Sequence, residues 1–300
     1  MTGLFKTYGF LLSIPLLCSL VFVAKSRHFT TPNTVVPSDI VMQAQPLLFD
    51  SVHRNRYRFW YEGARKNVYL DSFRRFYQID TLVRGLRSDS ARALRLLHWT
   101  HRQWSHNGSA EPSRSDAFTI LHEAKAGERF RCVEYSIVAA TALNAIGLPA
   151  RVLSLKTKDV ETRASSAGHV VLEVYLRDLK KWAVLDGQWN MMPVAGGMPL
   201  NAVELQRTLV LDNNSVVFRS LSMQVTKAFY SYWLTPYLYY FDVAFDNREG
   251  HAVKPMGNEG KLRLMLVPIG AKEPTVFQQK WPLTGFVYSH SLQDFYAPPY

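Results

Sequence analysis

The sequence predicts an α+β protein whose helices precede residue 149 and whose strands follow it. Before Pro149, apolar residues recur every three or four positions, which is the spacing of an amphipathic helix. After Pro149 the pattern becomes strand-like and is enriched in β-branched residues. A polar turn at 177–180 joins two of these runs into a hairpin. The predicted helices span residues 90–104, 116–126 and 132–146, and the predicted strands span residues 150–155, 169–176 and 181–186.

Each predicted helix has recognisable ends. Asn107-Gly108 follows the first helix, and Ser115 precedes the second, which stops at Gly127. The third helix begins near Cys132 and closes at Gly147-Leu148-Pro149. Helix packing accounts for all three segments without any reference to function.

The hairpin determines which way its side chains face. With the turn at 177–180, Leu176 pairs with Lys181. His169 and Asp186 then project to the same side of the sheet at diagonal range, because alternate residues of a strand share a face. A register slip of one residue would put them on opposite faces.

Residues 201–300 are predicted to form a C-terminal β-rich aromatic extension. Its most conspicuous feature is the aromatic block at 229–241. Such a block is most often core or interdomain packing, and the alternative is a wall of a substrate cleft. The expected strands are residues 208–211, 215–221, 261–267 and 285–289.

The N-terminal segment predicts export. Lys6 precedes an apolar stretch at 8–24, in the manner of the basic and hydrophobic regions of a signal peptide. Cleavage would release a periplasmic protein, whereas an uncleaved segment would anchor the protein in the inner membrane. The expected organisation is a signal peptide or anchor at 1–26, a linker at 27–50, a domain with N-terminal basic helices at 51–200 and the extension at 201–300.

The formal net charge of +11, from 35 basic and 24 acidic residues, predicts attraction to anionic surfaces. Residues 54–95 alone hold 11 basic and 4 acidic residues, with aromatic residues between them at 57–61. Nucleic-acid binding is one interpretation, but no nucleic-acid fold motif accompanies the charges. We favour a helical face near anionic headgroups or a cell-envelope polymer, and expect no nucleic acid as partner.

Cys132 is the candidate nucleophile. Of the two cysteines, Cys18 lies in the N-terminal apolar segment, so the remaining domain has one thiol and no internal disulfide. At the first turn of a helix, free N–H groups and the helix dipole stabilise a thiolate, and Arg129 and Arg131 are expected to add positive potential. His169 would act as base and Asp186 would orient it.

These residues lie in segments that resemble the transglutaminase-like superfamily in order and spacing. The cysteine-helix part is Gly-Glu-Arg-Phe-Arg-Cys-Val-Glu-Tyr-Ser at 127–136 followed by Leu-Asn-Ala-Ile-Gly-Leu-Pro-Ala-Arg-Val at 143–152. The histidine strand is 168–175 and the aspartate strand is 181–186. The resemblance implies a papain-like α+β core in which the cysteine helix packs against an antiparallel sheet. The chain departs from the family at His169-Val-Val, where His-Ala-Trp is common, and after Asp186, where Gly-Gln-Trp replaces Pro-Thr.

The resemblance also implies thioester chemistry on amides of peptide or protein substrates. Hydrolysis is favoured over acyl transfer to an amine, because a transferase must exclude water from the thioester. An oxyanion donor besides the Cys132 backbone N–H is expected, and Gln103, Trp104 and Gln188 are candidates. No metal or cofactor is expected, because the sequence shows no zinc-cysteine or calcium-loop pattern. The alternative function is a non-catalytic binding or scaffolding protein of the cell envelope on the same fold.

Overall fold

The computed structural model describes residues 45–52, 57–61, 67–250 and 260–299. The chain divides into two units, Met1–Val35 and Val36–Tyr300, and every described residue belongs to the second. The segment 1–26 and most of the linker at 27–50 therefore lie outside the described residues. Within the described part of the chain, no helix combines the length and apolar character needed to cross a bilayer.

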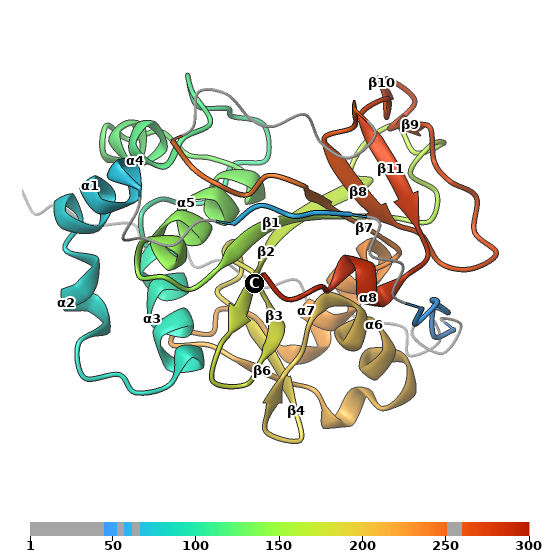
Figure 1. Ribbon diagram of the computed structural model, residues 1–300, viewed down its shortest axis with the longest axis horizontal. Coiled ribbons are helices and arrows are strands. Elements are labelled where there is room, and N and C mark those ends of the chain that lie inside the picture. Colours follow the sequence, from blue (N-terminus) through green and yellow to red (C-terminus); the bar gives the residue numbers. More distant parts are fainter. Residues whose placement is uncertain (1–44, 53–56, 62–66, 251–259, 300) are drawn as a thin grey trace, which may run out of the picture. The chain divides into compact units, whose positions relative to one another are not determined.

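Within the described ranges, five helices precede the central strands (Figure 1). Three of them confirm predicted helices. Their ends follow from a side-chain cap in one case and from a glycine in another. Asp116 begins the second predicted helix by accepting a hydrogen bond from the backbone N–H of Thr119. Gly147 adopts a left-handed φ of 75° just beyond the third, a conformation that ends helices at low steric cost. The helices are α1 (Val68–Phe76), α2 (Ile79–Val83), α3 (Asp89–His101), α4 (Ala117–Lys125) and α5 (Cys132–Ala145).

The central sheet has six strands in the order β11-β8-β7-β1-β2-β3, and only the β11–β8 pair is parallel. Leu176 pairs with Lys181 in the β2–β3 hairpin, so the predicted register is confirmed. The fold is thus α+β with an antiparallel-dominated sheet, as the sequence predicts. The strands of this sheet are β1 (Ala150–Lys156), β2 (Gly168–Leu176), β3 (Lys181–Leu185), β7 (Tyr240–Ala244), β8 (Arg263–Leu266) and β11 (Phe286–Ser289).

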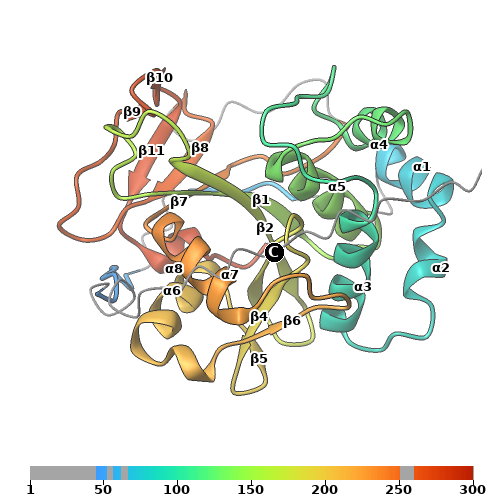
Figure 2. The same ribbon diagram turned by 180° about the vertical axis from the view of Figure 1, so that it is seen from behind.

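The described residues form three hydrophobic clusters, and the two larger ones lie on opposite faces of β2. Leu172 and Val174 of β2 pack into a core shared with α3, α4 and α5. Val171, on the other face of the same strand, joins a core built mainly from residues beyond 200. Figures 1 and 2 show α1–α5 to one side of β1–β3 and the later helices to the other.

The segment beyond residue 190 supplies both strands and helices. Its helices are α6 (Ala202–Leu211), α7 (Lys227–Leu234) and α8 (Leu292–Phe295), with short 3-10 turns η3 (Asn213–Ser215) and η4 (Thr235–Tyr237). A three-stranded sheet contains β4 (Met192–Ala195), β5 (Met198–Pro199) and β6 (Val217–Arg219), and a two-stranded sheet contains β9 (Val276–Phe277) and β10 (Trp281–Pro282).

The predicted strand at 208–211 is wrong, because these residues end α6. Asn201 caps this helix and Glu204 returns a hydrogen bond to the Asn201 backbone N–H, forming a capping box. Once that box nucleates the helix, the local β propensity of the Thr-Leu-Val-Leu run is overridden. The other three predicted strands of the extension contain β6, β8 and β11.

The basic stretch at 54–95, expected to present a helical face, contains α1, α2 and the start of α3, but its aromatic residues at 57–61 are not helical. Trp60 forms a β-bridge with Asp246, so the segment is extended. The rings of Tyr57 and Phe59 lie 5.9 and 5.4 Å from the ring of Phe245. These aromatic side chains therefore contribute to packing.

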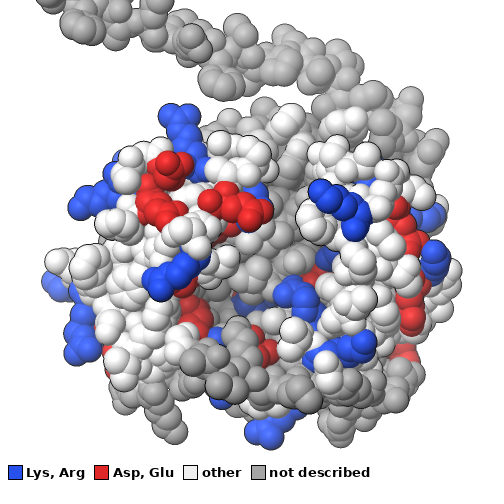
Figure 3. Space-filling view, turned by 90° about the horizontal axis from the view of Figure 1, so that it is seen from above, with Lys and Arg blue, Asp and Glu red and all other residues white. Residues whose placement is uncertain are grey.

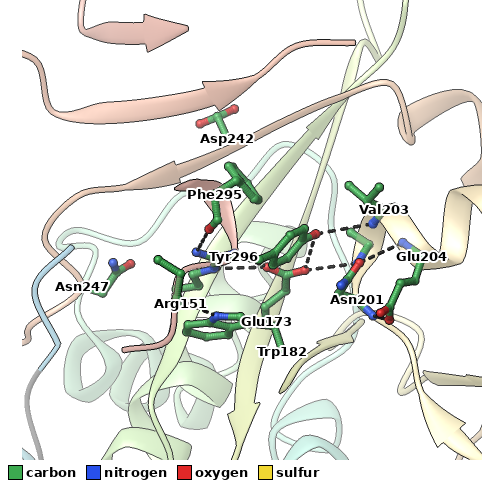
Figure 4. Close-up of polar contacts among 12 residues, drawn as sticks. Arg151, Glu173, Trp182, Asn201, Val203, Glu204, Asp242, Asn247, Phe295 and Tyr296 are labelled. Carbon is green, nitrogen blue, oxygen red and sulfur yellow. Dashed lines mark hydrogen bonds and ion pairs between the residues drawn. The ribbon is translucent and has the colours of Figure 1, made fainter. Parts of the chain in front are cut away.

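A buried ion pair ties the C-terminal end to the sheet (Figure 4). Arg151 on β1 and Glu173 on β2 are both fully buried, with 2.7 Å between Nη2 and Oε2. Arg151 also donates to the Phe295 carbonyl, and Glu173 accepts from the Tyr296 hydroxyl at 3.0 Å. Such a pair is tolerated in the interior only when its remaining hydrogen-bonding groups are satisfied.

If residues beyond 200 belong to the main core, Phe241 on β7 must contribute to global stability. Its side chain is fully buried, and β7 lies between β1 and β8 in the central sheet. We expect Phe241→Ala to lower the free energy of unfolding by about 3–5 kcal/mol in urea denaturation. Val217→Ala, at a side chain that is 57% exposed, serves as control and should change it by less than about 0.5 kcal/mol. Equal effects of the two variants would contradict this packing.

Candidate active site

Cys132 is the first residue of α5 and the free cysteine of the described chain. Glu134 accepts a hydrogen bond from the Arg131 backbone N–H at 3.0 Å, which fixes the start of the helix. Ser136, one turn further, places its Oγ 3.0 Å from the Cys132 carbonyl and 3.1 Å from the Val170 carbonyl. The cysteine end of the helix is thereby held against β2, next to His169.

His169 and Asp186 form a buried contact. His169 Nε2 lies 2.8 Å from Asp186 Oδ2, and each residue is only 2% exposed. The confirmed hairpin register explains the meeting, because it directs both side chains to one face of the sheet. Two further donors reach the carboxylate: the Trp189 backbone N–H at 3.0 Å from Oδ1 and the Tyr230 hydroxyl at 2.8 Å from Oδ2.

The imidazole of His169 is held between Asp186 and Cys132. Burial by itself would lower its pKa, but the charge and hydrogen bond of Asp186, followed by a hydrogen bond with the Cys132 side chain, raise the pKa of His169 from 6.5 to about 10. Since Nε2 is engaged by Asp186, Nδ1 is the ring nitrogen left for the thiol. The structure therefore brings the three predicted residues together.

Arg131 does not add free positive potential to Cys132, contrary to the sequence-based expectation. Its guanidinium forms ion pairs with Glu134 at 2.8 Å and with Glu111. Two carboxylates thus compensate one cation beside the helix start. Stabilisation of negative charge at Cys132 is left to the helix N-terminus and to His169.

The aromatic block contributes three residues that the sequence did not single out. Tyr230 contacts Asp186 directly, as described above. The ring of Trp233 stands edge-on to His169 at 4.8 Å, and the ring of Tyr237 lies 5.9 Å from it. Part of the block therefore covers the histidine, and the density of aromatic residues at 229–241 was the available signal.

The predicted oxyanion donors lie in two different places. Trp104 and Gln188 line one cavity of about 610 Å³, together with His106 and Trp189. His106 connects this cavity with the histidine–aspartate pair. Its pKa is lowered first by burial and then by the charge of His169. Gln103 instead donates to the Trp99 carbonyl at 2.8 Å and lines a separate cavity beside α1 and α4.

No group of three or more histidine, cysteine or acidic side chains in the described ranges is arranged to hold a metal ion.

The site combines an α+β fold with a helix-start cysteine and a histidine–aspartate pair on the adjoining sheet. Residues 78–187 match the family model of the transglutaminase-like superfamily. Cys132, His169 and Asp186 all lie within this range. No curated protein matches the sequence.

Several solved structures align with parts of this chain. A Cytophaga hutchinsonii protein, named as a candidate cysteine protease, has a TM-score of 0.33 and 12% identity over 53% of this chain and 55% of that chain. The periplasmic domain of TgpA from Pseudomonas aeruginosa has a TM-score of 0.30 and 17% identity, over 43% of this chain and 45% of that chain. Red sea bream transglutaminase has a TM-score of 0.32 and 14% identity, over 67% of this chain and 38% of that chain. The aligned part thus spans about half or less of these structures.

Gly187 is expected to be irreplaceable after Asp186. A Cβ at this position would lie 2.8 Å from Tyr135 Cβ and 3.3 Å from the Tyr135 carbonyl carbon, so the loop would have to move. We expect Gly187→Ala to cost about 1–3 kcal/mol in urea unfolding and to weaken the His169 Nε2 proton signal in NMR spectra. Gly285→Ala, where an added Cβ meets nothing within 4 Å, should leave both unchanged. An unperturbed Gly187→Ala protein would contradict the close approach.

The raised His169 pKa predicts a direction for stability against pH. Because the folded pKa of about 10 exceeds the ordinary 6.5, the contribution is fully present below about pH 6.5 and is lost as the pH rises toward 10. The free energy of unfolding, measured in urea at about pH 6, 8 and 10, should therefore fall more steeply in the wild type than in His169→Gln. His122→Gln, at an exposed position of α4, is the control. Parallel pH profiles for wild type and His169→Gln would refute the assignment.

Proposed function

We propose that this chain is a cysteine enzyme that hydrolyses amide bonds of peptide or protein substrates through a Cys132 thioester. The observation that carries the proposal is the buried contact of His169 Nε2 with Asp186 at 2.8 Å, together with a Cys132 side chain that helps to raise the pKa of His169. A carboxylate that binds one ring nitrogen leaves the other to exchange a proton with the nucleophile. The match to the transglutaminase-like superfamily supports the same chemistry.

The steps follow from these contacts. The Cys132 thiolate attacks the amide carbonyl carbon, forming a C–S bond and an oxyanion. His169 then gives its Nδ1 proton to the amide nitrogen, the C–N bond breaks and the amine leaves. Water attacks the thioester, His169 takes its proton, and the C–S bond breaks to release the carboxylic acid. Asp186 holds the imidazole in one orientation throughout.

The developing oxyanion needs hydrogen-bond donors. The Cys132 backbone N–H, free at the first position of α5, is one. Trp104 and Gln188 are the better side-chain candidates, because they share the cavity that His106 connects with the histidine–aspartate pair. The interaction of Gln103 with its own helix argues against that residue.

Hydrolysis rather than acyl transfer is our preference, because water needs no binding site of its own. A transferase would have to bind an amine and exclude water from the thioester.

We further propose that the protein is exported and works in the periplasm or at the inner membrane, on the basis of the apolar stretch at 8–24 after Lys6. On the face in Figure 3, acidic and basic residues are interspersed, and no continuous basic surface for an anionic polymer is visible there. This face gives no support for an anionic polymer as partner, and the proposed substrates are peptide or protein amides.

The proposal is tested with the full-length chain and denatured protein substrates. Mass spectrometry would follow new amino termini, deamidated side chains and isopeptide cross-links, which separate proteolysis, deamidation and transfer. We expect Cys132→Ala to reduce turnover at least about a thousandfold, and Asp186→Asn at least about a hundredfold. A thioester adduct should appear on Cys132 in the wild type.

Cys18→Ala is the matched control, because it removes the other thiol of the chain and should leave turnover unchanged. Absence of turnover combined with tight peptide binding that survives Cys132→Ala would favour a scaffolding protein instead.

A further inference from the structure

Tyr230 contacts the histidine–aspartate pair directly. It belongs to α7, outside residues 78–187, and its side chain is 2% exposed. Its hydroxyl donates to Asp186 Oδ2 at 2.8 Å, the same oxygen that receives His169 Nε2 at 2.8 Å. One carboxylate oxygen is thus shared between the imidazole and a phenol.

The phenol is held rigidly in that position. Its ring packs edge-on to Phe218 at 4.8 Å and stacks on Trp233 at 6.3 Å. Thr226 caps the start of α7 by accepting a hydrogen bond from the Phe229 backbone N–H, which fixes the turn that carries Tyr230. The hydroxyl therefore keeps its position on Asp186 whether the imidazole of His169 is neutral or charged.

Sharing an acceptor has a defined electrostatic consequence. A hydrogen bond donated to a carboxylate stabilises the anion and reduces its attraction for another proton donor on the same oxygen. In the absence of the Tyr230 hydroxyl, Asp186 Oδ2 would have only the imidazole as side-chain donor. The carboxylate would then attract the His169 proton more strongly.

We propose that Tyr230 is a positioning residue of the active site, which fixes the Asp186 carboxylate and weakens its hold on the His169 proton. The consequence is an imidazolium that gives up its proton more readily to the leaving amine. This inference rests on the proposed function, because only a working histidine base requires such tuning.

The other titratable groups around the pair set the background of the effect. Cys132 of α5 reaches His169, His106 lies within the electrostatic range of both His169 and Asp186, and Tyr237 of η4 lies near Cys132. Tyr230 differs from them in its direct hydrogen bond to Asp186. Burial, followed by the charge of Asp186, raises the pKa of Tyr230 well above 10, so it remains a donor at every working pH.

The test is a titration of His169 by NMR in full-length, histidine-labelled protein, with Tyr230→Phe compared to wild type. We expect His169 to titrate at a pH higher by at least about 0.5 unit in Tyr230→Phe, and its Nε2 proton to resonate further downfield at neutral pH. A titration unchanged within about 0.2 unit, or moved to lower pH, would overturn the inference.

Two further variants keep the test decisive. Tyr240→Phe removes a buried hydroxyl that donates to the Lys272 carbonyl at 2.9 Å, and should leave the His169 titration unchanged. Site-specific 3-fluorotyrosine at position 230 preserves the shape but strengthens the donor, so the titration should move to lower pH. This variant also decides the matter if Tyr230→Phe does not fold, since an unchanged titration would again overturn the inference.

The titration needs no substrate, so its outcome is separable from that of the proposed function. A shifted His169 in a protein without amide turnover would defeat the enzyme proposal alone. Turnover that depends on Cys132, combined with an unshifted titration, would defeat the role of Tyr230 alone.

Discussion

The register of the β2–β3 hairpin is the constraint on which the site depends. Pairing of Leu176 with Lys181 sends His169 and Asp186 to one face of the sheet, and a slip of one residue would separate them. That face is also apolar at Val171 and must be covered. The cover comes from residues beyond 200, so the segment that completes the core also encloses the histidine–aspartate pair.

Local patterns were sufficient to predict the part of the chain that carries the site. The glycine stops of α4 and α5, the hairpin turn and the alternation along β2 are all encoded within a few neighbouring residues, and the structure agrees with them, although α4 is capped by Asp116 rather than Ser115. The placement of Cys132 at the helix start and of His169 beside Asp186 followed from these short-range rules. The family resemblance was concentrated in the same stretch, where sequence spacing and spatial proximity are most closely linked.

The features that the sequence did not predict are long-range. Tyr230 meets Asp186 across 44 positions, and nothing in either segment announces the other. Arg131 was expected to act on Cys132, yet Glu111, 20 positions away, helps to compensate its charge. The run at 208–211 was judged by its own β propensity, whereas a capping box seven residues upstream decided its conformation. In each case the deciding partner lay outside the window in which propensity and periodicity operate.

Two buried pairs on the same face of β2 show how a structural ion pair differs from a reactive one. Arg151 and Glu173 are saturated: the guanidinium also binds the Phe295 carbonyl, and the carboxylate also binds Tyr296 and the Ala202 backbone N–H. His169 and Asp186 are saturated on the carboxylate side only, because Nε2 is engaged by Asp186 and Nδ1 is left to interact with Cys132. A buried charge whose partners are complete can only hold the fold together. A buried imidazole with one nitrogen beside a thiol retains a proton that it can exchange, and this difference in saturation separates the candidate active site from the rest of the core.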